Sequence, residues 1–160
     1  MRGVSERLLP YVPRLVVDWL RDTPTAAHRR IEGTLAFCDV SGFTALTERL
    51  AAGGKAGAEE MGEILNTVFT ELLVSAYAQG AALLKYGGDA VLLLYQGPEH
   101  EVRACRSAWT MQRTMDHIGD LRTSVGPAHL QMSIGIHSGP IDFFLAGSKH
   151  RELVVTGPVA

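Results

Sequence analysis

The chain has 160 residues, 46% of them hydrophobic and 20% charged, with a formal net charge of −2 at pH 7. This length and composition fit one globular domain that can bury a core without disulfides or metals, and they exclude a disordered chain. The near-neutral charge gives no sign of a nucleic-acid partner, and no run reaches the ~20 apolar residues that a membrane span needs, so we expect a cytoplasmic protein without membrane contact.

The chain opens with an apolar segment, residues 8–20, that reads LLPYVPRLVVDWL. Its apolar residues after Pro13 recur at helical spacing, and proline suits the first turn of a helix. A polar stretch over residues 22–33 follows and is typical of a linker. We therefore expect an N-terminal helix and linker over residues 1–30 and the main domain over residues 31–160.

A short apolar run, GTLAFCDV at residues 33–40, predicts a buried strand with Asp39 near its C-terminal end. Two helices are expected to follow, over residues 44–50 and 58–78, because their apolar residues recur at helical spacing. The main domain therefore begins with a strand and a helical segment.

Two further apolar runs flank Gly87-Gly88-Asp89, which predicts a β-hairpin over residues 81–96 with an acid in its turn. Next we expect a helix over residues 101–118, a loop, a strand over residues 130–137, and two short strands around a polar turn at residues 147–150. This order is that of the ferredoxin-like split βαβ motif. We predict an α+β fold, βαββαβ, with an antiparallel sheet and helices on one face.

Asp39 and Asp89 are expected to lie side by side. In the predicted topology the first and third strands pair antiparallel, which puts the end of one beside the start of the other. Two adjacent carboxylates repel each other unless a cation intervenes, and Mg²⁺ prefers one or two carboxylates together with phosphate oxygens and water. The segment from Ser41 to Thr44 leads into a helix whose free N–H groups could hold phosphate oxygens. The pattern favours a metal site for phosphate chemistry.

Each acid also has a structural interpretation. Asp39 could cap the following helix, which is a common role for an aspartate after a strand. Gly88-Asp89 could serve only the geometry of the turn. The two cysteines, Cys38 and Cys105, have no partner at metal-ligand spacing, and we expect both to be small buried side chains in a reducing compartment.

Four segments carry motifs in a fixed order: FCDVSGFTALTERL, LLKYGGDAVLLLY, IGIHSGP and ELVVTGPV. As an ordered set they resemble the two metal motifs, the following strand and the later segment of the class III adenylyl and guanylyl cyclase catalytic domain. The opening LLPYVPRLVVDWL is similar to the lead-in of the first, metal-binding half of the soluble, bicarbonate-responsive subgroup. The resemblance extends from this opening segment to the end of the chain.

The resemblance implies conversion of ATP to 3′,5′-cyclic AMP and pyrophosphate, or of GTP to cyclic GMP, by in-line attack. Two metal ions per site would assist, Mg²⁺ or Mn²⁺, with Ca²⁺ as an alternative. Sites of this family form between two cyclase domains, a tandem pair or a homodimer. By matching, Asp39 and Asp89 are the implied metal ligands and catalytic residues, and the Val40 carbonyl is a further metal ligand. The implied phosphate-binding residues are Ser41, Gly42, Phe43 and Thr44.

Lys85 and Val154 match the family positions that select the purine. In the first half of the soluble subgroup the matching lysine belongs instead to a degenerate pocket that takes bicarbonate. Lys85 is flanked by apolar residues, although a strand lysine can also simply reach solvent. Val154 can neither donate nor accept a hydrogen bond, so we expect weak purine recognition by this domain.

Two other features depart from the family pattern. Ser133 stands where cyclases that bind triphosphate usually carry Arg or Lys, which removes a charge-assisted contact. The sequence ends at Ala160, before the helix whose Asn and Arg the family uses at the transition state, so we expect a domain that is incomplete at its C-terminus. The leading hypothesis is the metal-donating half of an adenylyl cyclase, with little or no turnover alone.

Two competing hypotheses remain. The fold could serve as a silent regulatory or dimerisation domain that senses nucleotide or bicarbonate. A diguanylate cyclase is disfavoured because Ala90 follows Asp89, where that signature needs a second acid. Among the histidines, we expect His137 to be a structural residue at a strand end and His100 to face solvent at the start of a helix.

Overall fold

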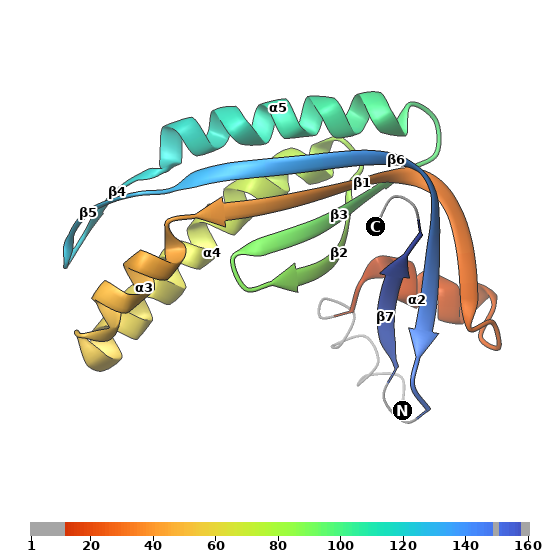
Figure 1. Cartoon of the computed structure of the whole chain (residues 1–160), viewed down its shortest axis with the longest axis horizontal. Helices are drawn as coiled ribbons and strands as arrows, with labels where there is room; N and C mark the ends of the chain where they lie inside the picture. The colour runs from red at the N-terminus through yellow and green to blue at the C-terminus, as the bar shows by residue number, and fades with distance from the viewer. Residues whose placement is uncertain (1–11, 149–150, 158–160) are drawn as a thin grey trace.

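The chain folds around a curved antiparallel sheet (Figure 1). The computed structural model describes residues 12–148 and 151–157. In these residues one sheet has the order β2-β3-β1-β6-β7, and β4 and β5 form a separate pair. The strands are β1 (His28–Ser41), β2 (Ala82–Gly87), β3 (Ala90–Gln96), β4 (Asp120–Thr123), β5 (Gly126–His129), β6 (Gln131–Ala146) and β7 (Glu152–Thr156). The helices are α2 (Arg14–Asp22), α3 (Phe43–Ala51), α4 (Gly54–Ala78) and α5 (His100–Ile118).

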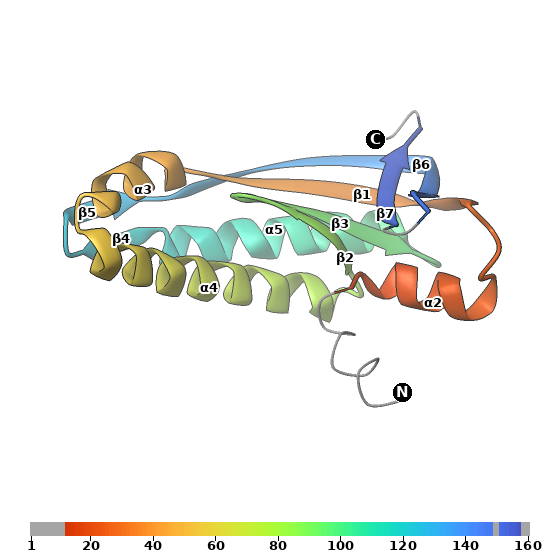
Figure 2. The same cartoon turned by 90° about the horizontal axis from the view of Figure 1, so that it is seen from below.

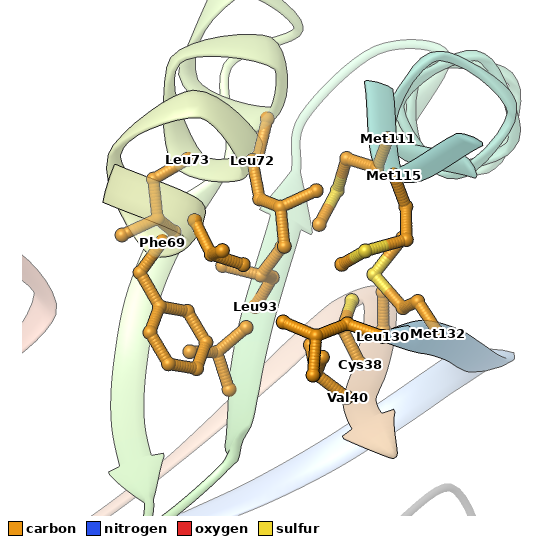
Figure 3. Close-up of a cluster of buried hydrophobic side chains, with 14 of the residues drawn as sticks. Cys38, Val40, Phe69, Leu72, Leu73, Leu93, Met111, Met115, Leu130 and Met132 are labelled. Atoms are coloured by element: carbon orange, nitrogen blue, oxygen red, sulfur yellow. The ribbon is translucent and has the colours of Figure 1, made fainter. Parts of the chain in front are cut away.

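Helices α4 and α5 lie side by side against one face of the sheet (Figure 2). Alternate residues of the central strands point toward them, because successive side chains of a strand face opposite ways. Figure 3 shows the resulting core, in which side chains of both helices meet those of β1, β3 and β6. Its labelled members are Cys38, Val40, Phe69, Leu72, Leu73, Leu93, Met111, Met115, Leu130 and Met132.

Helix α2 covers part of the opposite face. Leu15 and Trp19 are buried in a second cluster that includes Leu35 of β1, Leu94 of β3 and Phe143 of β6. These strand residues alternate with those of the first cluster, so they belong to the other face of the sheet. The expected N-terminal helix after Pro13 is therefore confirmed, and it closes a second, smaller core.

The predicted α+β fold with an antiparallel sheet is confirmed, but several boundaries differ. Strand β1 begins at His28, inside the expected linker. Strand β6 continues to Ala146, through a segment expected to be a separate short strand. The physical reason is mutual pairing: β1 and β6 are hydrogen-bonded from His28 opposite Phe144 to Ser41 opposite Gln131. Long strands are stabilised here by each other rather than by local sequence.

Two further expectations are corrected. The loop expected after α5 contains the β4–β5 hairpin. Cys38 is buried as predicted, whereas Cys105 is exposed, because it follows the buried Ala104 on a helix that turns only one face to the sheet. No helix within the described part of the chain is long and apolar enough to cross a membrane.

Candidate functional site

The pairing of β1 with β3 brings Asp39 and Asp89 to the same end of the sheet. Asp39 lies opposite Ala90 in the ladder, and Asp89 immediately precedes that residue. The Val40 N–H donates a hydrogen bond to the Asp89 carbonyl at 3.0 Å. The expected juxtaposition of the two strand ends is confirmed, while the metal-binding role of the two side chains stays a prediction.

The two carboxylates are suited to a divalent metal. Both residues are half-buried, and neither side chain has a hydrogen bond or ion pair with another of the residues that the structure describes. Those residues contain no group of three or more His, Cys, Asp or Glu that could hold a metal. Two carboxylates without partners match the one or two that Mg²⁺ takes alongside substrate phosphates.

Neighbouring Cys38 does not extend this ligand set. Its side chain faces the helices in the main core, and burial raises the pKa of the thiol to about 12. A thiol binds metal as a thiolate. Cys38 is therefore a structural residue at neutral pH, and Asp39 is the residue of this strand end that could hold a metal.

The turn after β1 presents the N-terminus of α3 next to the acids. Gly42 adopts φ of 99° in the left-handed region, and α3 starts at Phe43 with no capping hydrogen bond from a side chain of any described residue. The first N–H groups of a helix have no intrahelical partner. Phe43 is buried and Thr44 is exposed. The Phe43 side chain therefore anchors the turn in the core, while the turn is accessible to solvent at Thr44. Its free N–H groups could hold an anion, and this role stays a prediction.

Gly42 is required by packing as well as by backbone geometry. A Cβ at this position would lie 2.7 Å from the His129 carbonyl oxygen and 3.1 Å from Leu130 Cδ2. Ser41 Oγ donates a long hydrogen bond, 3.4 Å, to the Gln131 carbonyl. The turn therefore rests on the chain that leaves the β4–β5 hairpin, a support that the sequence motifs did not reveal.

Lys85 and Val154 have different surroundings. Lys85 Nζ lies 3.0 Å from Glu152 Oε1, which links the two edge strands of the curved sheet. Val154 lies opposite Phe144 and is exposed. Its neighbour Val155 lines an apolar cavity of about 440 Å³. Glu152 was missed by sequence reasoning because its proximity to Lys85 depends on the curvature of the sheet.

Ser133, His137 and His100 lie in three different environments. Ser133 is the direct cross-strand neighbour of Asp39 on β6 and is exposed. His137 is not at a strand end but within β6, where it lines the same apolar cavity. His100 does begin a helix but is buried rather than facing solvent. Its Nδ1 lies 2.7 Å from Thr34 Oγ1, so this polar ring has a partner inside the fold.

Comparison with known proteins identifies relatives over most of the chain. Residues 26–159 match the family described as the adenylate and guanylate cyclase catalytic domain. Adenylate cyclase type 10 of Rattus norvegicus is 33% identical over 151 residues, which cover 91% of this chain and 9% of that protein. The Homo sapiens protein of the same name is 26% identical over 156 residues, 94% of this chain and 10% of that protein. The chain thus spans about a tenth of these relatives.

Solved structures share the fold. A bacterial light-regulated adenylyl cyclase superposes with a TM-score of 0.77 at 21% identity, over 97% of this chain and 46% of that one. Adenylyl cyclase CyaB from P. aeruginosa gives a TM-score of 0.66 at 22% identity, over 83% and 69%. The guanylate cyclase domain of RhGC from Catenaria anguillulae, solved with GTP, gives 0.65 at 23% identity, over 82% and 69%.

The matched family covers nearly all of the described residues, and it includes both strand ends that carry the paired aspartates. The observed α+β architecture agrees with that of the solved cyclases. This chain therefore belongs to the adenylate and guanylate cyclase catalytic domain family, the class III nucleotidyl cyclases.

Proposed function

We propose that this chain is the metal-donating half of an adenylyl cyclase, which forms 3′,5′-cyclic AMP and pyrophosphate from ATP together with a complementary cyclase half. The observation that supports the proposal most strongly is the pair of half-buried carboxylates, Asp39 and Asp89, at adjacent strand ends without side-chain partners among the described residues. The choice of ATP rests on the curated relatives, which are named adenylate cyclase type 10.

In this proposal, Asp39 and Asp89 hold Mg²⁺ or Mn²⁺, and the Val40 carbonyl adds a ligand. Bound metal would neutralise phosphate charge and favour in-line displacement at phosphorus. The N–H groups at the start of α3, from Phe43 and Thr44, would hold phosphate oxygens, since they have no intrahelical partner and carry the positive end of the helix dipole. These residues bind and orient the triphosphate, and the complementary half would supply the base pocket and the transition-state groups.

A second candidate function is a regulatory cyclase domain that senses nucleotide or bicarbonate without turnover. Ser133 favours it, because the position directly opposite Asp39 carries a hydroxyl where a cation would neutralise triphosphate. Val154 also favours it, because an exposed valine cannot read a purine edge. Lys85 would be the anion ligand, and Glu152 would compete for it.

Calorimetric titration of the chain with Mn²⁺, alone and with a non-hydrolysable ATP analogue, tests the metal site. We expect Asp39→Asn and Asp89→Asn each to weaken Mn²⁺ binding by about 10-fold or more, because removal of one carboxylate halves the ligand charge. The control is Glu71→Gln, which changes an exposed carboxylate on α4. Equal Mn²⁺ affinity in all four proteins would refute the metal assignment.

Mixing experiments separate the two functions. A complementary cyclase half that carries the purine-selecting and transition-state residues is added to the chain, and cyclic AMP is measured. Synthesis that appears only in the mixture, and is abolished by Asp39→Asn, supports the catalytic proposal. A mixture that forms a stable complex, binds ATP and stays silent supports the regulatory alternative.

A further inference from the structure

The β4–β5 hairpin is fastened to two helices at its tip. Arg49 Nη2, in the last turn of α3, donates hydrogen bonds to the carbonyl oxygens of Val125 at 2.7 Å and Pro127 at 3.1 Å. Glu60 of α4 accepts hydrogen bonds from both the backbone N–H and the hydroxyl of Ser124. A two-stranded hairpin this short is marginally stable in isolation. Leu121 packs the base of the hairpin against the main core, and the side chains of Arg49 and Glu60 hold its tip.

The other end of the hairpin supports the turn before α3. The chain leaves β5 at His129, whose carbonyl oxygen touches Gly42 so closely that no Cβ fits there. Leu130 is buried in the main core, and its N–H donates to the Gly119 carbonyl at 2.8 Å. Figures 1 and 2 both place α3 and the hairpin at the same end of the molecule. The base of the hairpin thus contacts the turn before α3, and its tip contacts Arg49 in the last turn of α3.

Helix α3 has nine residues, so it is a short rigid rod about 13 Å long. Phe43, Leu46 and Leu50 bury one face of α3. The contact of Gly42 with His129 holds its first end, and Arg49 holds its last turn. We propose that the β4–β5 hairpin is a brace that sets the direction of α3, and that Arg49 and Glu60 are positioning residues for triphosphate binding. The inference rests on the proposed function, since it concerns the same phosphate-binding turn.

The brace acts on phosphate contacts and not on the metal carboxylates. Asp39 and Asp89 are placed by the pairing of β1 with β3. The N–H groups of Phe43 and Thr44, in contrast, lie along the axis of α3, so their direction changes when the helix tilts. Loosening the hairpin lets the helix pivot and misaligns these donors, and hydrogen bonds weaken steeply with misalignment. Metal affinity and triphosphate affinity should therefore respond differently to the same substitution.

Simple electrostatics makes a different prediction. If only charge mattered, loss of the Arg49 cation would weaken binding of a polyanion, and loss of the Glu60 anion would strengthen it. The brace predicts that both losses weaken it. Whether Glu60→Gln weakens or strengthens nucleotide binding therefore separates the two explanations. Arg122→Ala is the matched control for charge, because Arg122 is an exposed cation on the hairpin itself.

The experiment titrates wild type, Arg49→Ala, Glu60→Gln and Arg122→Ala with Mn²⁺ alone, and with α,β-methylene-ATP in saturating Mn²⁺. We expect Arg49→Ala and Glu60→Gln each to raise the Kd for the nucleotide roughly 3- to 10-fold, the effect of one lost hydrogen-bonded contact. The Kd for Mn²⁺ should not change. Hydrogen exchange should be faster in both variants at the Leu46 amide, whose N–H donates to the Gly42 carbonyl at 3.1 Å and closes the first turn of α3.

The outcomes are distinguishable. Tighter nucleotide binding by Glu60→Gln, or unchanged exchange at the Leu46 amide in both variants, overturns the brace while leaving the metal site intact. If the wild type binds neither Mn²⁺ nor nucleotide, the proposed function fails, and hydrogen exchange still decides whether the hairpin orders the turn. Should Arg49→Ala fail to fold, Ser124→Ala removes only the hydroxyl contact with Glu60 and is measured in the same way.

Discussion

Asp39 and Ser133 are cross-strand neighbours in the β1–β6 ladder, so the side chain at position 133 affects the local charge next to the two acids of the proposed metal site. A serine leaves that charge negative, which opposes a triphosphate. Residues directly opposite each other on antiparallel strands have Cβ atoms about 5 Å apart, which is within reach of a long side chain. In the proposed site, the identity of this one residue would therefore limit nucleotide affinity without any change in the fold.

Ser133→Arg should strengthen binding of the Mn²⁺-bound ATP analogue by about 10-fold or more, the scale of one charge-assisted hydrogen bond. Ser133→Gln adds a polar side chain without the charge and should leave the affinity close to that of the wild type. Calorimetry on the three proteins measures the difference. An arginine variant that binds no better than the glutamine variant would contradict the role given to this position.

Single side chains show where sequence reasoning succeeds and where it stops. The juxtaposition of Asp39 and Asp89 was predictable, because strand order alone decides which strand ends are neighbours. The burial of His100 was not, because its partner Thr34 is 66 positions away on another element. Thr34 in turn lies 2.7 Å from Ser138. This row of hydrogen-bonded side chains forms only when β1, β6 and α5 pack together, so the sequence pattern of one element does not predict it.

One carboxylate, that of Asp142, links the start of β1 to the end of β6, at the opposite end of these strands from Asp39. Asp142 accepts hydrogen bonds from Arg30 Nε at 2.9 Å and Nη2 at 2.6 Å, and it lies 2.7 Å from His28 Nε2. The guanidinium of Arg30 first, and then His28, lower the pKa of the Asp142 carboxyl from 3.8 to about 2. The ionised form is therefore the one that favours the folded state.

The sign of the pH dependence follows from this lowered pKa. The contribution of Asp142 to stability is complete above pH 3.8 and is lost as the pH falls toward about 2. We expect the urea midpoint of the wild type to fall over this range more steeply than that of Asp142→Asn. Asp116→Asn, an exposed acid on α5, should keep the wild-type slope. Parallel slopes in all three proteins would exclude Asp142 as the titrating group.

Elements with strong local patterns were predicted well, and those that depend on pairing were not. The hydrophobic spacing gave both ends of α5 to within one residue and the end of α4, whereas α4 begins at Gly54 and not at residue 58. Strand β6 was predicted too short, since Gly139 and Pro140 interrupt its pattern although the strand continues along β1. The β4–β5 hairpin has too few apolar residues for a strand signal, and it is held by Arg49 and Glu60 at its tip and by Leu121 against the core.

At the scale of the whole molecule, the strong curvature of the sheet has two candidate causes. In a flat sheet of this order, β2 and β7 would lie about 19 Å apart, four strand spacings. In the structure Lys85 of β2 reaches Glu152 of β7, so the ion pair links the two edges. Both side chains are largely exposed, at 60% and 62%. Exposed pairs of this kind contribute about 0–1 kcal/mol.

The second cause is the core beneath α2. Trp19 is fully buried, and its Nε1–H donates to the Ala26 carbonyl at 3.0 Å. Its cluster contains residues from β1, β3, β6 and, at its margin, Leu153 and Val155 of β7. Leu84 of β2 belongs to the same cluster, so the core beneath α2 draws on all five strands of the sheet and can hold it curved. Burial of several large apolar side chains outweighs one exposed ion pair.

Trp19→Ala should therefore lower the free energy of unfolding by about 3–5 kcal/mol, as expected for removal of a buried aromatic side chain. Lys85→Met should change it by less than about 1 kcal/mol. Urea denaturation at one pH and ionic strength compares the two, and Leu15→Ala provides a second, smaller truncation in the same cluster if Trp19→Ala does not fold. A cost for Lys85→Met equal to that of either truncation would show that the ion pair, and not the α2 core, holds the sheet edges together.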